Sequence, residues 1–221
     1  MDFQANQLRA KLDETVLKAV SEVRKEIYDN TIIPVVLNWF ENDSSLNDLN
    51  AKIISEVNGR WNFINSKLNV IFSEFLAYSG ETFKVSNKTG TADFDTKKIL
   101  TSISENITLA LGAAGTSIIA MIAGGSGTAL IATGPIGLII GAAIGIYAFI
   151  KGKEKLNDEV KKFIVDKNLP PLVKKLGKNK VMTELYASTN AFDNEVYKIL
   201  TETLRPVYSI IDKKILDSNG D

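Results

Sequence analysis

The chain has 221 residues with 26 basic and 26 acidic side chains, and the resulting formal net charge of zero excludes a global electrostatic case for binding nucleic acid. It contains neither cysteine nor histidine, which excludes disulfides, thiol chemistry and the commonest general base and metal ligand. We therefore expect no catalytic residues, no metal, no cofactor and no small-molecule substrate, and we predict that this chain is not an enzyme.

The first hundred residues predict two long amphipathic helices. Apolar residues recur every three or four positions over residues 3–38 and again over 45–78. Asn30, Thr31 and Pro34 are expected to interrupt the first of these helices. Residues 79–94 contain two glycines and a cluster of Ser, Asn and Thr, which predicts a loop or a short β-hairpin. Helix should resume near Asp95 and run to residue 123. Residues 1–105 thus form the amphipathic part of a bundle, with an irregular segment at 79–94.

Residues 106–150 contain no charged side chain, although 24% of the chain is charged. A helix of a soluble protein usually keeps a polar face, so this run should lie in lipid or be enclosed by protein. Its length fits two short apolar helices joined by a turn, the second beginning near residue 135 and running to about 166. We expect this hairpin to associate with a membrane, permanently or conditionally. The alternative is a hairpin buried in a soluble core.

The turn of the hairpin is rich in glycine and uncharged, so it could enter a bilayer without desolvating an ion. The expected tip residues are Gly124, Gly125, Gly127, Leu130, Ile131 and Pro135. In the second helix Gly137, Gly141 and Gly145 share one face, on which the first hairpin helix is expected to pack closely. The expected contacts on that first helix are Ala110, Gly112–Ala114 or Ser117.

The segment after the hairpin is basic. Residues 151–180 contain ten lysines against four carboxylates, and lysines beside an apolar segment favour anionic lipid headgroups. The alternative is an ordinary solvated helix face. The expected headgroup ligands are Lys151, Lys153, Lys155, Lys161 and Lys162. Residues 151–221 should therefore form a basic amphipathic helix and a C-terminal bundle helix over 180–215, with a kink at Pro206.

Together these patterns predict an all-α protein, an elongated antiparallel helical bundle that carries an uncharged Gly/Ala-rich helical hairpin. The expected partner is the lipid bilayer, and self-association is also expected. The N-terminal residues MDFQANQLRAKLDE are polar, unlike a secretory signal peptide. We therefore expect a cytoplasmic protein that is peripheral to the membrane or conditionally inserted in it.

The stretch GTALIATGPIGLIIGAAIGIYAFIKGKEKLNDEVKKFI, followed by LPPLVKKL, resembles the C-terminal region of bacterial dynamin-like NTPases. In those proteins an apolar hairpin forms the membrane paddle of a helical trunk, and some bacterial Hsp70-like proteins carry a similar helical region. The resemblance covers residues 104–215 and is compositional. It implies a membrane-associating module of a larger NTPase, whose nucleotide-binding domain is absent from this sequence. A weaker resemblance to α-helical pore-forming toxins implies a pore-former, and a soluble partner-binding scaffold is the third alternative.

Overall fold

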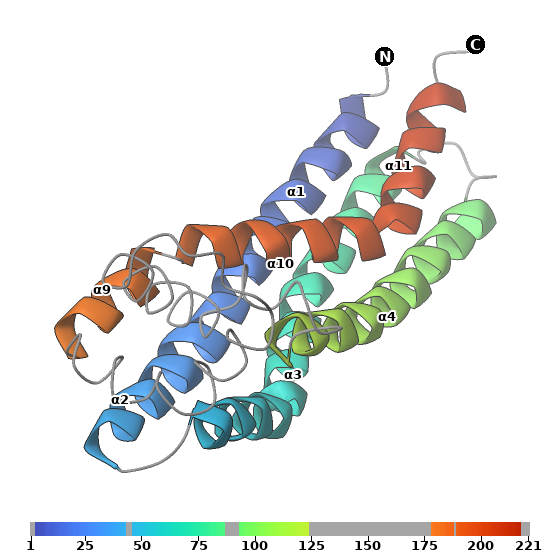
Figure 1. The fold of residues 1–221 in the computed structure, drawn as a ribbon. Coiled ribbons are helices and arrows are strands. Elements are labelled where there is room, and N and C mark those ends of the chain that lie inside the picture. The colour runs from blue at the N-terminus through green and yellow to red at the C-terminus, as the bar shows by residue number, and fades with distance from the viewer. Residues whose placement is uncertain (1–2, 43–45, 87–92, 124–177, 188, 218–221) are drawn as a thin grey trace, which may run out of the picture. The chain divides into compact units, whose positions relative to one another are not determined.

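The computed structural model describes residues 3–42, 46–86, 93–123, 178–187 and 189–217, and every regular element in these ranges is a helix (Figure 1). The predicted all-α class is therefore confirmed. The chain divides into two compact units. Unit 1 contains Met1–Val23, Trp61–Ser117 and Glu195–Asp221, and unit 2 contains Arg24–Arg60 and Ile118–Asn194.

The helices follow the apolar spacing of the sequence. In chain order they are α1 (Phe3–Arg24), the π-helix η1 (Lys25–Ile32), α2 (Ile33–Glu41), α3 (Leu46–Ser86), α4 (Asp93–Ala123), α9 (Lys178–Ala187), α10 (Thr189–Thr203) and α11 (Arg205–Asp217). The helices expected over 3–38, 45–78 and 95–123 are thus present with shifted ends, whereas the single helix expected over 180–215 is divided into α9, α10 and α11. The helix expected over 135–166 lies outside the described residues.

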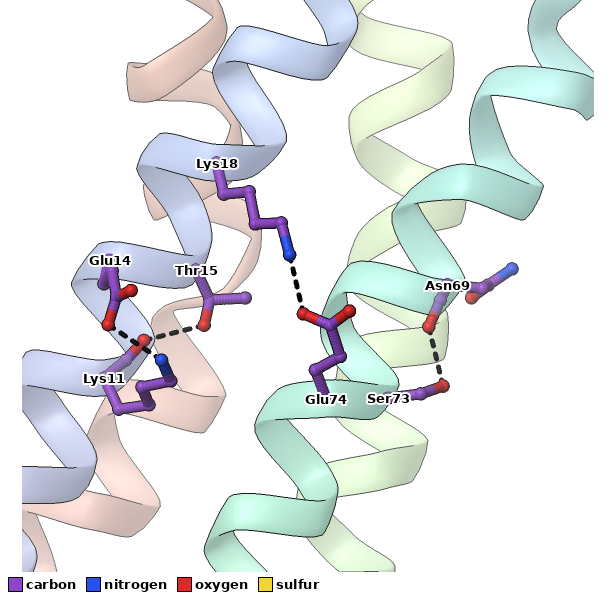
Figure 2. Close-up of polar contacts among 7 residues, drawn as sticks. All are labelled: Lys11, Glu14, Thr15, Lys18, Asn69, Ser73 and Glu74. Atoms are coloured by element: carbon purple, nitrogen blue, oxygen red, sulfur yellow. Dashed lines mark hydrogen bonds and ion pairs between the residues drawn. The ribbon is translucent and has the colours of Figure 1, made fainter.

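In unit 1, α1 runs antiparallel to the second half of α3. Two ion pairs join them. The Nζ of Lys18 lies 2.6 Å from Glu74 (Figure 2), and the Nζ of Lys67 lies 2.5 Å from Glu22. Residue numbers rise along α1 as they fall along α3, which defines the antiparallel direction. Exposed ion pairs of this kind contribute little stability because water and salt screen them.

The apolar core of unit 1 supplies most of its stability, since burying a Val, Leu, Ile or Phe side chain contributes about 1.5–3 kcal/mol. Helices α4 and α11 and the second part of α10 complete this core beside α1 and α3 (Figure 1). The fully buried core side chains of unit 1 include Leu8, Leu12, Val16, Ile64, Leu68, Phe72, Phe75, Ile103, Leu111, Val196, Leu200, Leu204 and Val207.

In unit 2 the chain stays helical through the expected interruption at residues 30–34. The π-helix η1 joins α1 to α2 there, and the amide of Ile33 donates to the carbonyl of Tyr28, five residues back. The hydroxyl of Thr31 donates to the carbonyl of Glu26 at 2.8 Å, which reinforces the same five-residue spacing. Pro34, which has no N–H, lies in the first turn of α2, directly after the π-helix, so the helix continues past it without a backbone bond from this position. The expectation of a break was therefore wrong.

The irregular segment expected at 79–94 was also wrong for its described part. Helix α3 continues to Ser86, and α4 begins at Asp93. Ser79 is buried and its hydroxyl donates to the carbonyl of Phe75 at 2.8 Å, while Thr82 donates to Tyr78 at 2.8 Å. Both hydroxyls are thus satisfied inside the helix, so they do not divert the backbone into a turn.

The kink expected at Pro206 is confirmed as a helix boundary. Helix α10 ends at Thr203 and α11 begins at Arg205. The amides of Val207 and Tyr208 both donate to the carbonyl of Leu204, at 2.9 and 3.1 Å. Proline removes one amide donor from the helix, and the chain bends where that bond is missing.

Candidate functional site

The uncharged run of the sequence begins inside α4, and its first part is described by the structure. From Asn106 to Ala123 this helix has one buried face and one exposed face. The buried face consists of Ile107, Ala110, Leu111, Ala114, Ile118 and Ile122, with Gly115 beside them. The exposed face consists of Thr108, Leu109, Gly112, Ala113, Thr116, Ser117 and Ala120. The outward surface of α4 from Thr108 to Ala120 thus carries no charge.

The helix that carries this face has the length and composition of a membrane-spanning helix. Thr96–Ile122 is 27 residues long and apolar enough to cross a membrane, yet only 39% of its most apolar 18-residue window is buried. The core helix of a soluble protein with this composition is mostly buried. Leu109, at 72% exposure, is the clearest case of an apolar side chain facing outward here.

The hydroxyls on the exposed face of α4 bond to the helix itself. Thr108 donates to the carbonyl of Ser104 at 3.0 Å, and Thr116 donates to that of Gly112 at 3.3 Å. Moving such a hydroxyl out of water costs less free energy than moving an unbonded one, because its hydrogen bond to the helix carbonyl is kept. The polar atoms of this face are therefore compatible with an apolar surrounding.

Helix α3 of the same unit also exposes apolar side chains, beside the charged Lys67 and Glu74. Its exposed residues between 62 and 73 are Asn62, Phe63, Ser66, Asn69, Val70 and Ser73. Phe63 is 53% exposed and Val70 is 61% exposed. The hydroxyl of Ser73 donates to the carbonyl of Asn69 at 2.7 Å, again within the helix (Figure 2). With Leu17 of α1, which is 59% exposed, unit 1 thus exposes large apolar side chains from α1, α3 and α4.

The charged contacts of unit 1 involve α1 and α11. Arg9 forms an ion pair with Asp212, and the hydroxyl of Tyr208 donates to Asp13 at 2.7 Å. Burial raises the pKa of Tyr208 well above its ordinary value, and the hydrogen bond to Asp13 raises it further. The phenol therefore stays protonated over the physiological range and ties α11 to α1.

Unit 2 contains ion pairs around its π-helix. Glu26 is 3% exposed and lies 3.3 Å from Arg60, and Asp193 lies 3.0 Å from Arg24. Burial raises the pKa of the Asp193 carboxyl, and the adjacent Arg24 opposes that shift. Each of the two carboxylates contacts an arginine of another helix, and at Asp193 the effect of burial on the pKa outweighs that of the arginine. Sequence spacing did not predict these pairs, because residues 34 and 169 positions apart form them.

The described residues offer little for small-molecule or metal chemistry. Among them no three His, Cys, Asp or Glu side chains cluster so as to hold a metal ion. A cavity of about 240 Å³ in unit 2 is lined in part by Asn38, Trp39, Asn42 and Leu49. Two of its polar side chains bond to each other, the Nδ2 of Asn42 donating to the Oδ1 of Asn38 at 3.0 Å. These two amides are therefore engaged with each other across the cavity lining.

The site residues predicted from sequence fall mainly outside the described ranges. This applies to the expected tip, to Gly137, Gly141 and Gly145, and to the expected headgroup lysines between 151 and 162. Among the contacts expected on the first hairpin helix, Ala110 and Ala114 are buried, whereas Gly112, Ala113 and Ser117 are exposed. The predicted face therefore divides into a buried and an open part, which periodicity alone did not separate.

No family model, no curated protein and no solved structure matches this chain. The functional assignment therefore rests on the physical properties of the sequence and of the described helices.

Proposed function

We propose that this chain is a non-catalytic, membrane-associating helical module that places its uncharged hairpin on or into a lipid bilayer. The observation that carries the proposal is the exposed, uncharged face of α4 from Thr108 to Ala120. This face continues in sequence into residues 124–150, which also contain no charge. A bilayer is a partner that accepts such a surface without requiring a specific complementary shape.

The length of α4 supports this proposal. Residues 106–123 form 18 helical residues, which rise about 27 Å, close to the roughly 30 Å of a bilayer hydrocarbon core. The last charged residue before this segment is Glu105, and Lys97 and Lys98 are exposed in the preceding turns. Charged residues thus end where an inserted helix would meet the headgroups.

The basic segment after the hairpin supplies the second element of the proposal. Lys151, Lys153, Lys155, Lys161 and Lys162 would contact anionic headgroups once the hairpin is in the membrane. Each lysine near an anionic surface contributes about 1 kcal/mol at best. We accordingly propose a cytoplasmic protein that binds anionic membranes reversibly and self-associates there.

The resemblance to the dynamin-like C-terminal region suggests the larger context. We propose that the module belongs to a bacterial NTPase and that nucleotide chemistry resides outside this sequence. Calorimetric titration of the chain with ATP and GTP, together with a phosphate-release assay, tests this point. Stoichiometric binding or turnover by this chain alone would contradict it.

Liposome flotation combined with release of an entrapped dye tests the membrane proposal. We expect the chain to float with liposomes, more strongly when they contain anionic lipid, and to leave the dye inside. Dye release would instead favour the pore-forming alternative. A chain that remains at the bottom of the gradient with every lipid composition would favour a soluble scaffold and overturn the proposal.

A further inference from the structure

Trp61 of α3 lies directly against Gly115 of α4, within unit 1. A Cβ atom added at Gly115 would overlap the Nε1, Cε2 and Cζ2 atoms of the indole, all closer than real Cβ contacts come. Gly115 is buried, and Trp61 is half-buried. The absence of a side chain at position 115 is therefore what lets the indole approach the α4 backbone.

Gly112, three residues earlier in the same uncharged segment, has a different environment. It is exposed, and a Cβ added there would have nothing within 4 Å. Both residues are helical glycines, so both lower the helix propensity in the same way. They differ only in contact, which makes Gly112 a matched control for Gly115.

We propose that the contact between Trp61 and Gly115 is a latch that holds the uncharged half of α4 on the bundle until a membrane is present. This inference rests on the proposed membrane function. For residues 106–117 to enter a bilayer, Ile107, Leu111 and Ala114 must leave the core of unit 1. The indole lies close to the α4 backbone at a position without a side chain, and a small displacement of α4 breaks this contact.

A latch of this kind sets the balance between two states. The closed state keeps α4 against α3, and the inserted state exchanges that contact for lipid. A substitution that weakens only the closed state shifts the population toward insertion by the same factor. Membrane binding therefore requires a lipid surface whose binding free energy is large enough to break the contact between Trp61 and Gly115.

The test compares wild type, Gly115→Ala and Gly112→Ala in binding to liposomes that contain anionic lipid. A methyl group at position 115 displaces the indole, and a tenfold change in the balance corresponds to about 1.4 kcal/mol, within the range found for overpacked interfaces. We expect Gly115→Ala to reach half-binding at about one-tenth of the wild-type lipid concentration. Gly112→Ala should bind like the wild type.

A second pair of variants keeps the test valid if Gly115→Ala folds poorly. Trp61→Ala adds no atom to the core and should lower the half-binding lipid concentration in the same direction. Combining Trp61→Ala with Gly115→Ala should give no further change, because the two substitutions break one contact. Far-UV circular dichroism without lipid must show equal helix content in the variants compared.

Fluorescence gives an independent measure of latch opening. The chain has two tryptophans, so a Trp39→Phe background leaves Trp61 as the only indole. We expect its emission to move to longer wavelength on adding liposomes, because α4 leaves it exposed to water. A shift to shorter wavelength would mean that Trp61 itself enters the membrane, and this outcome would overturn the latch.

The outcomes separate the latch from the proposed function. Equal binding by the wild type, Gly115→Ala and Gly112→Ala would overturn the latch and leave the membrane function standing. If neither the wild type nor Gly115→Ala bound liposomes, both the latch and the proposed membrane function would be overturned. Additive effects of Trp61→Ala and Gly115→Ala would show that the contact is not the element that controls insertion.

Discussion

The two halves of α4 share one continuous buried face but differ in what they expose. Between Asp93 and Glu105 the outward side chains include Lys97 and Lys98, and from Asn106 onward none is charged. Up to Ser117 the buried face follows from the core of unit 1, which requires apolar spacing in both halves, and the buried Ile118 and Ile122 belong to unit 2. A different surrounding of the outward face would account for the loss of charge. The exposed side of residues 106–123 is therefore where we expect the function of this helix to lie.

The largest expected effect separates the two faces of that second half. Leu111 is 1% exposed and Leu109 is 72% exposed. Leu111→Ala should lower the free energy of unfolding by about 2–5 kcal/mol, because it removes buried contacts and leaves a cavity. Leu109→Ala should change it by less than about 0.5 kcal/mol. Urea unfolding followed by circular dichroism measures both. Similar losses would mean that Leu109 is covered in solution and would contradict the exposed face.

The next prediction compares the exposed faces of the two halves. Thr101 and Thr116 are both exposed and both donate to the carbonyl four residues back, at 2.9 and 3.3 Å. Thr116→Asp should weaken liposome binding by about 2.5–3.5 kcal/mol if that residue reaches the bilayer centre. Thr101→Asp should change it little, since the first half already carries charge.

Both aspartate variants should unfold at urea concentrations close to that of the wild type, because neither side chain is buried. Equal liposome binding by the two variants would place position 116 outside the membrane. A large loss of stability confined to Thr116→Asp would instead indicate that protein covers this face, as in the soluble-scaffold alternative.

A smaller effect is expected at the hydrogen bond between Tyr208 and Asp13. Tyr208→Phe removes a half-buried bond to a carboxylate and should cost about 1–2 kcal/mol. Tyr197→Phe is the control, since Tyr197 is 38% exposed. This site stabilises the bundle without touching the uncharged face, so Tyr208→Phe should lower stability without selectively removing lipid binding.

The raised pKa of Tyr208 gives this prediction a pH dependence. The folded state holds the phenol proton more tightly than the unfolded state, whose tyrosine has a pKa near 10. The stabilisation is fully present below that value and is lost as the pH rises above it. Comparing wild type with Tyr208→Phe between neutral pH and pH 11 isolates this contribution from the lysines. Parallel stability curves would contradict the assignment.

The smallest expected effect concerns the exposed pair of Lys18 and Glu74. The hydrogen bond from Lys18 lowers the pKa of Glu74, and the charge of Lys18 lowers it further. The associated stabilisation is present above the ordinary glutamate pKa and is lost as the pH falls through the lowered one. Titration of the Glu74 carboxyl by NMR should show the pKa rise toward its ordinary value in Lys18→Met, although the charge of Lys11 still lowers it. An unchanged pKa would contradict the contact drawn in Figure 2.

The sequence predicted the helices of this protein because their spacing repeats over many turns. It failed where local composition and tertiary context disagree. Residues 79–86 look like a turn, but their hydroxyls are satisfied by the helix carbonyls, and the buried Ser79 packs within it. The π-helix from Lys25 to Ile32 has no periodicity signal of its own, since it shifts the register by only one residue per turn.

The candidate site was predictable only in part, for a related reason. The sequence alone shows that residues 106–150 carry no charge, and this absence predicted the candidate segment. Which side of α4 is covered depends on the neighbouring helices, so the separation of Gly112 from Gly115 required the position of Trp61. A tryptophan 54 positions away in sequence gives no local sign of which glycine it contacts.

A single fluorophore placed on either half of α4 tests the central claim most directly. The chain has no cysteine, so Thr116→Cys and Thr101→Cys each provide one labelling site for an environment-sensitive dye. We predict that adding liposomes containing anionic lipid will raise the emission of the label at position 116 and shift it to shorter wavelength, while the label at position 101 stays close to its value in water. Emission at position 116 that remains water-like while the protein floats with the liposomes would contradict insertion of the uncharged half of α4.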